Sequence, residues 1–249
     1  MIVFFNFEAE LYKKHNVPVS FVGNPLLDNV KTAISRKELL RKAELKTDLL
    51  TISLLPGSRE KEVKTLLPVM LECAKIINGY LLGRVQFLIL RSPSVKEEIF
   101  PKSLKGYDLP IKIISGLTYD GLAASDFSLV CSGTATLETA ILATPMVILY
   151  KVNFLTWIFI RMMIKIPNIG LVNVVKGRKI AEEFIQFDAE PEKICDYVIP
   201  LLQDKDKLCR LKLELLSIKL LLGEPGASIR AAEIIVNLLK NSCTSSIIP

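Results

Sequence analysis

The chain has 249 residues, half of them hydrophobic and 23% charged, and its 32 basic and 26 acidic side chains leave a net charge of +6. A chain this apolar can bury enough surface to offset its ordering entropy, which excludes disorder, and 12 glycines and 13 prolines without a period exclude a collagen-like fibre. Aromatic residues make up only 7% and the basic residues form no dense block, so we expect no nucleic-acid partner. A phosphorylated small molecule, an anionic membrane surface or an ordinary solvated surface all suit this weak charge.

The first 48 residues predict no complete domain. Residues 1–20 carry one possible short strand and one helical turn, and residues 21–27 are typical of a connector. We therefore expect residues 1–28 to be the remnant of an upstream domain whose body is missing, together with its connector.

The middle of the chain alternates between strands and helices. Five short apolar runs predict strands, at 49–54, 85–90, 111–114, 127–130 and 146–150. Helical spacing lies between them, at 60–77, 119–124 and 135–142. Continuous apolar strands that alternate with helices predict a parallel sheet covered on both faces, and right-handed crossovers make it a doubly wound α/β layer.

The end of the chain predicts helices alone. Residues 191–202, 204–222 and 227–239 have helical spacing, and the break at 223–226 contains two glycines and a proline. We expect the sheet domain to cover residues 29–202 and a helical tail to cover 203–249.

Cysteine usage indicates a reducing compartment. No two of the five cysteines have CxxC spacing, and His15 is the only histidine, so no zinc site is expected. Four cysteines lie among apolar residues and are typical of small core side chains: Cys73, Cys131, Cys195 and Cys209. The chain is expected to be cytoplasmic.

Two apolar stretches raise the question of a membrane. Residues 1–7 lack a basic region and a long apolar core, so they are not a signal peptide. Residues 154–166 are too few to span a bilayer, and Arg161 and Lys165 interrupt them. This segment could lie at a membrane surface as an amphipathic helix, or pack against the core, and both interpretations stay open.

The turn after the first strand of the predicted sheet contains Gly57, Ser58 and Arg59, with Glu62 three residues further on. Ligands of open α/β sheets bind at this edge. The free N–H groups of a helix N-terminus attract phosphate, and Arg59 can add a bidentate contact. A tight turn with a solvated arginine is the alternative, and this turn alone does not decide between the two.

A second turn of small residues follows the fourth strand and contains Ser132, Gly133, Thr134 and Ala135. Gly133 permits close backbone approach, and the hydroxyls and amides of the turn suit a pyrophosphate. One turn into the helix, Glu138 can accept hydrogen bonds from both hydroxyls of a ribose. A serine N-cap with a surface glutamate is the alternative, but two phosphate-type turns in one sheet favour a ligand site.

Other enzyme signatures are missing. No GxGxxG follows a strand, and residues 116–121 have Walker-like glycine spacing but Leu122 in place of the lysine. There is no GxSxG, and a single histidine argues against a Ser-His triad. We expect His15 at the surface.

Several of these stretches together resemble the lipid-A-disaccharide synthase family, namely residues 54–63 (LLPGSRxxEV), 123–151, 166–168 (IPN) and 183–186 (EFIQ). Residues 21–28 are similar to the interdomain segment of that family, with Asn24 where a histidine is usual. The specific part runs from SGTATLE to PMVILYK, because LPGSR-type and SGT-type turns recur in other two-domain glycosyltransferases.

The resemblance implies the C-terminal, nucleotide-binding half of an inverting GT-B-type glycosyltransferase with two Rossmann-like domains. Such an enzyme joins UDP-2,3-diacylglucosamine to 2,3-diacylglucosamine 1-phosphate and releases UDP. The residues that would bind the UDP moiety are Gly57, Ser58, Arg59 and Glu62, then Ser132, Gly133, Thr134, Ala135 and Glu138, and finally Asn168 and Gln186. These groups would stabilise the charge on departing UDP, so no metal and no cofactor is expected.

The resemblance also implies surroundings and partners. The enzyme would work peripherally at the cytoplasmic face of the inner membrane of a Gram-negative-type bacterium, with a homodimer as a possible assembly. The acyl-chain pocket and the catalytic base belong to the family's N-terminal domain, so we expect no catalytic residue and no full activity in this chain alone. A non-catalytic UDP-sugar-binding remnant and a UDP-sugar epimerase of similar architecture are the alternatives.

Overall fold

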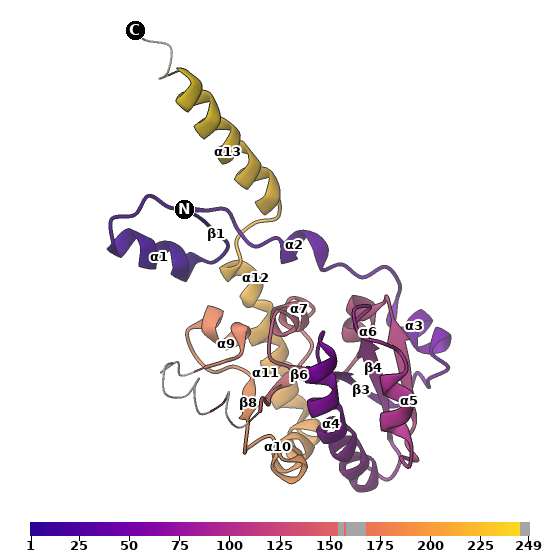
Figure 1. Cartoon of the computed structure of the whole chain (residues 1–249). Coiled ribbons are helices and arrows are strands. Elements are labelled where there is room, and N and C mark those ends of the chain that lie inside the picture. Colours follow the sequence, from indigo (N-terminus) through magenta and orange to yellow (C-terminus); the bar gives the residue numbers. More distant parts are fainter. Residues whose placement is uncertain (154–156, 158–167, 245–249) are drawn as a thin grey trace.

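A parallel sheet of six strands forms the centre of the computed structural model, which describes residues 1–153, 157 and 168–244 (Figure 1). In chain order the strands are β3 (Leu50–Leu55), β4 (Val85–Arg91), β5 (Ile111–Ser115), β6 (Phe127–Cys131), β7 (Met146–Tyr150) and β8 (Glu182–Ile185). They lie side by side in the order β5-β4-β3-β6-β7-β8, and every neighbouring pair is parallel. All carboxyl ends therefore meet at one edge, and the strand order reverses between β3 and β6.

The five apolar runs of the sequence are confirmed as β3 to β7, to within one residue at each end. Strand β8 is an addition that the apolar pattern does not predict. It contains Glu182 and Glu183, and its strand partner in the described chain is β7 alone. An edge strand with one partner needs no continuous apolar run, which is why the pattern misses it.

Helices cover both faces of the sheet. One face packs against α4 (Glu60–Tyr80), α5 (Ile99–Leu104) and α10 (Pro191–Gln203). The other packs against α3 (Arg36–Lys42), α6 (Thr118–Ala124), α7 (Ala135–Ile141) and α9 (Leu171–Lys176). The neighbouring residues Phe87 and Leu88 are buried in opposite clusters, as strand alternation requires. This confirms the Rossmann-like layer expected from the sequence.

The helical tail contains α11 (Lys205–Leu216), α12 (Ile218–Leu221) and α13 (Ala227–Thr244), so the prediction of one continuous helix over 204–222 is wrong. The interruption falls at Ser217. Its hydroxyl donates to the carbonyl of Glu214 at 2.6 Å and accepts from Nζ of Lys176 at 2.5 Å. A serine hydroxyl that bonds to a carbonyl of the preceding turn competes with the helical ladder.

The N-terminal residues form a small unit of their own. Strands β1 (Ile2–Val3) and β2 (Ser20–Phe21) are parallel and are joined by α1 (Asn6–Lys14), and His15 is exposed as predicted. The connector, with α2 (Leu26–Asn29), then leads to the sheet domain, while α13 projects away from it (Figure 1). The connector contacts the start of α13, where Arg230 donates through Nε to the carbonyl of Val22 at 2.9 Å.

Three of the four cysteines assigned to the core are buried, but Cys209 is exposed, so that prediction is wrong. Helix α11 turns Leu208, Leu211 and Leu215 toward the core. At about 100° per residue the neighbouring Cys209 therefore points away, despite its apolar sequence context.

Searched over the described residues, the helices include none with the length and hydropathy needed to cross a bilayer. The segment 154–166, apart from residue 157, lies outside the described residues. Both interpretations of that segment stay predictions.

Candidate functional site

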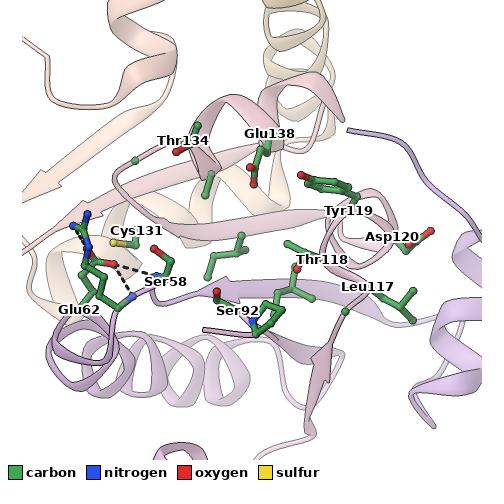
Figure 2. Close-up of a pocket in the computed structure, with 18 of the residues that line it drawn as sticks. Ser58, Glu62, Ser92, Leu117, Thr118, Tyr119, Asp120, Cys131, Thr134 and Glu138 are labelled. Atoms are coloured by element: carbon green, nitrogen blue, oxygen red, sulfur yellow. Dashed lines mark hydrogen bonds and ion pairs between the residues drawn. The ribbon is translucent and has the colours of Figure 1, made fainter. Parts of the chain in front are cut away.

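A cavity of about 660 Å³ opens at the carboxyl edge of the sheet, beside the ends of β3 and β6 (Figure 2). This crevice, where the strand order reverses, is the place at which open α/β sheets bind ligands. Every predicted residue of the two phosphate-type turns lines it, namely Gly57, Ser58, Arg59, Glu62, Ser132, Gly133, Thr134, Ala135 and Glu138. Asn168 and Gln186 are not among its lining residues.

The first turn is closed by the side chain of Glu62. Its Oε2 accepts hydrogen bonds from the backbone amides of Ser58, at 3.1 Å, and of Arg59, at 3.2 Å. The Glu62 side chain thereby caps the start of α4, because it bonds to backbone amides that the helix itself leaves without acceptors. Gly57 makes it possible, because its φ is +126° and a Cβ there would lie 2.6 Å from Oε2.

Arg59 lies at the mouth of the cavity. Its side chain is 82% exposed, and Nη1 is 3.1 Å from Oε1 of Glu62. Arg59 is therefore exposed, as the alternative of a solvated arginine predicts. Its guanidinium is also paired with Glu62 and lines the cavity. A long exposed side chain can turn toward an anion at little cost because few contacts are lost.

Cys131 forms part of the cavity wall beside this turn. Burial, together with the nearby carboxylate of Glu62, raises the pKa of the Cys131 thiol to about 12, and Arg59 opposes the shift. Because the thiolate is the nucleophilic form, a thiol with this pKa is inert at neutral pH.

The second turn leaves two of its backbone donors free, while the amide of Ser132 donates to the carbonyl of Leu149 at 2.9 Å. Within the described residues, the amides of Gly133 and Thr134 donate no hydrogen bond to protein. Gly133 has open space where a Cβ would be, so the backbone itself faces the cavity. The turn is held from behind, because the hydroxyl of Thr136 donates to the carbonyl of Gly133 at 2.8 Å.

Ser132 is not the N-cap of α7, because Thr134 occupies that position. The Ser132 hydroxyl donates instead to the carbonyl of Ile169 at 3.3 Å. The turn is thereby joined to the segment that contains Asn168. This arrangement contradicts the serine N-cap alternative.

Glu138 and Tyr119 lie near each other on one side of the cavity (Figure 2). Burial raises the pKa of the Glu138 carboxyl. Burial, with a smaller effect of Glu138, also raises the pKa of the Tyr119 hydroxyl. A partly buried carboxylate that faces a cavity is the acceptor that sugar hydroxyls require, and it is not the surface glutamate of the alternative interpretation.

Asn168 and Gln186 lie outside the cavity wall. Gln186 is 5% exposed, and its amide bonds to both backbone groups of Val152, at 3.0 and 2.9 Å. Asn168 precedes Ile169 and Gly170, whose amides donate to the carboxylate of Glu183 at 2.8 and 3.0 Å. Both residues therefore belong to segments beside the second turn, and their contact with a ligand stays a prediction.

Residues that the sequence did not single out complete the wall. They are Lys31 and Ala33 from the connector, Ser92 and Pro93 after β4, and Thr118, Tyr119 and Asp120 after β5. Asp120 is buried, and its Oδ1 accepts from the amides of Ala33, at 2.6 Å, and Ile34, at 2.9 Å. The connector is thus attached at the rim of the cavity.

Asn24 takes part in the connector rather than the cavity. It is buried, its Oδ1 accepts from the amide of Leu26 at 3.0 Å, and its own amide donates to the carbonyl of Leu222 at 2.9 Å. Of the residues described, no three His, Cys, Asp or Glu side chains are grouped so that they could hold a metal ion.

Comparison with known proteins shows which family the chain resembles. A family model described as lipid-A-disaccharide synthetase matches residues 1–236. A lipid-A-disaccharide synthase of Syntrophus aciditrophicus is 44% identical over 243 residues, and one of Nitrosococcus oceani is 39% identical over 240 residues. These alignments cover 97% and 96% of this chain, but only 63% and 62% of the relatives, so the chain spans less than two thirds of their length.

The fold is shared more widely. The crystal structure of WaaG, a glycosyltransferase involved in lipopolysaccharide biosynthesis, aligns with a TM-score of 0.63 at 12% identity, covering 94% of this chain and 62% of WaaG. That likeness shows a GT-B-type fold, and the family model shows the family. The chain belongs to the lipid-A-disaccharide synthase family.

Proposed function

We propose that this chain binds the UDP moiety of UDP-2,3-diacylglucosamine and contributes the donor half of a lipid A disaccharide synthase. The observation that carries the proposal is the pair of turns at the β3/β6 crevice, one with an arginine and one with free amides, in a chain of this family. The epimerase alternative has no support of this kind, because the family that matches is a synthase.

The two turns divide the work on the nucleotide. Arg59 and the amides of Gly133 and Thr134 would hold the diphosphate, and Glu138 would accept from the ribose hydroxyls. Negative charge grows on the diphosphate as UDP departs, and donors fixed in advance stabilise that charge most where water is excluded. Asn168 and Gln186 would lie near the donor, outside the cavity wall of the free chain.

The acceptor chemistry would belong to the part of the relatives that this chain does not span, since the chain covers 63% and 62% of them. The full reaction would transfer the glycosyl group to 2,3-diacylglucosamine 1-phosphate and release UDP. Both substrates would carry acyl chains, so the reaction would take place at a membrane surface, on the cytoplasmic side where a UDP-sugar would be available. Taken alone, the chain would then be a UDP-sugar-binding module without catalysis.

Calorimetric titration with UDP tests the proposal. We expect the unaltered chain to bind UDP, and Arg59→Ala to bind at least about tenfold more weakly, because a charge-assisted contact to phosphate is lost. Arg178→Ala is the matched control, since Arg178 is also an exposed arginine paired with a glutamate, Glu214, at 3.0 Å but away from the cavity. No binding at millimolar UDP, or equal affinity for Arg59→Ala, would contradict the proposed site.

A further inference from the structure

We propose that Glu62 is an internal competitor of the diphosphate: its carboxylate occupies the donors of the first turn until the ligand displaces it. The inference rests on the proposed UDP site and assigns to Glu62 a role opposite to direct ligand binding. It makes Glu62 a positioning residue that tunes the affinity of the site for charged ligands.

The donors of the first turn are already used. Oε2 of Glu62 accepts from the amides of Ser58 and Arg59, and Oε1 lies 3.1 Å from the Arg59 guanidinium, as the dashed lines of Figure 2 show. A phosphate bound at this turn would use the same three donors. Carboxylate and phosphate are both anionic acceptors, so they cannot share these donors and would repel each other if both stayed.

The turn is shaped around the carboxylate. A Cβ at Gly57 would lie 2.6 Å from Oε2 and 2.7 Å from Cβ of Glu62, so a residue with a side chain at 57 would prevent the contact. The absence of a side chain at residue 57 thus leaves room for the carboxylate, which caps the start of the 21-residue helix α4. Capping alone explains its presence, but it does not explain why the capped amides and the paired arginine line the cavity.

A ligand with several negative charges can displace the carboxylate, because few interactions hold it in place. The Glu62 side chain is 29% exposed and that of Arg59 82% exposed, and an ion pair this open to water contributes little free energy. The second turn is free, because the described chain offers no acceptor to the amides of Gly133 and Thr134. A ligand can therefore bind at the second turn first and compete with Glu62 through its other phosphate.

Substitution of Glu62 by glutamine separates charge from shape. The amide oxygen of glutamine can still accept from Ser58 and Arg59, but it carries no negative charge. We expect Glu62→Gln to bind UDP about tenfold more tightly than the unaltered chain, which corresponds to the loss of one close charge repulsion. Uridine, which has no phosphate, should bind equally to both proteins.

Glu60→Gln is the matched control. Glu60 is in the same first turn of α4 and pairs with Lys64 and Lys96, but it does not line the cavity. Its substitution should leave UDP affinity within about twofold, because an exposed pair of this kind contributes little. Thermal unfolding of all three proteins would show that the variants are folded.

Inorganic pyrophosphate separates this inference from the proposed function. Suppose that Glu62→Gln binds pyrophosphate more tightly than the unaltered chain does, but binds UDP with no higher affinity than pyrophosphate. The competitor role of Glu62 then stands and the nucleotide assignment fails. If all proteins bind UDP but Glu62→Gln binds it equally or more weakly, Glu62 only shapes the turn, and the inference is overturned. If no protein binds either ligand, both proposals fail.

Discussion

Gly57 has a backbone conformation that only glycine adopts without strain, and a side chain there would collide with Glu62. We expect Gly57→Ala to lower the free energy of unfolding by about 2 kcal/mol, measured by urea denaturation. Gly79→Ala, also on α4, is the control, because a Cβ there meets nothing within 4 Å and alanine favours the helix by about 0.5–1 kcal/mol. Equal stability of Gly57→Ala and the unaltered chain would contradict this account of the turn.

The Glu138 carboxylate is expected to lower the stability of the fold at neutral pH and to raise the affinity for UDP. Burial raises the pKa of its carboxyl above the unfolded value, so the native state binds the proton more tightly and loses stability as pH rises through that interval. Glu138→Gln should therefore be more stable than the unaltered chain at pH 7, with the difference vanishing below about pH 4. Denaturation at several pH values would measure this.

The same variant should bind UDP about tenfold more weakly, because an amide accepts from ribose hydroxyls less strongly than a carboxylate does. A gain in stability with a loss of affinity is expected of a side chain kept for its ligand. Lower stability at pH 7, or unchanged affinity, would place Glu138 outside the site.

The elements of the sheet were predictable where burial is complete. Strands β3 to β7 are mostly apolar because both faces of the sheet are covered. Helices α3 and α9 gave no such signal: both are short, α3 buries only Leu39 and Leu40, and α9 buries a polar Asn173 in place of an apolar residue.

The two turns of the site were also predictable, because each directly follows a buried strand. Ser92 and Tyr119 were not, since they join the cavity only through the order of the strands, which periodicity does not encode. The attachment of Asp120 to the amides of Ala33 and Ile34 joins residues more than 80 positions apart. Such contacts follow from the fold and have no local signature.

Asn173 joins α9 to strand β8 and is fully buried. Its Nδ2 donates to the carbonyl of Ala181 at 2.8 Å and to Glu183 at 2.7 Å, and its Oδ1 accepts from the amides of Ile180 and Ala181 at 2.8 and 3.0 Å. Asn173→Leu removes these four hydrogen bonds at a fully buried position, including both bonds to the buried Ala181, while the Glu183 carboxylate keeps the amides of Ile169 and Gly170. We expect a loss of about 3 kcal/mol in unfolding free energy, measured with urea.

Asn78→Leu is the matched control for that loss. Its buried Oδ1 is without a hydrogen-bond partner in the described part of the chain, so an apolar replacement should cost far less. If the two substitutions lowered the free energy of unfolding equally, the hydrogen bonds of Asn173 would not be what holds β8 to α9.

Across the whole molecule, the connector contacts the start of α13 at one end and the rim of the cavity at the other. Asp28 accepts from the amide of Gly226 at 2.8 Å, and Arg230 holds the carbonyl of Val22. Asp120 then attaches the connector to the cavity rim. These polar contacts thus fix the position of the N-terminal unit relative to the cavity.

A crystal structure of the chain with UDP tests the central claim most directly. We predict that the diphosphate lies between the first and second turns, within hydrogen-bond distance of the Gly133 and Thr134 amides, with the ribose against Glu138 and the Glu62 carboxylate displaced from Ser58. UDP bound away from the β3/β6 crevice, or in the crevice with its phosphates turned from both turns, would contradict the account.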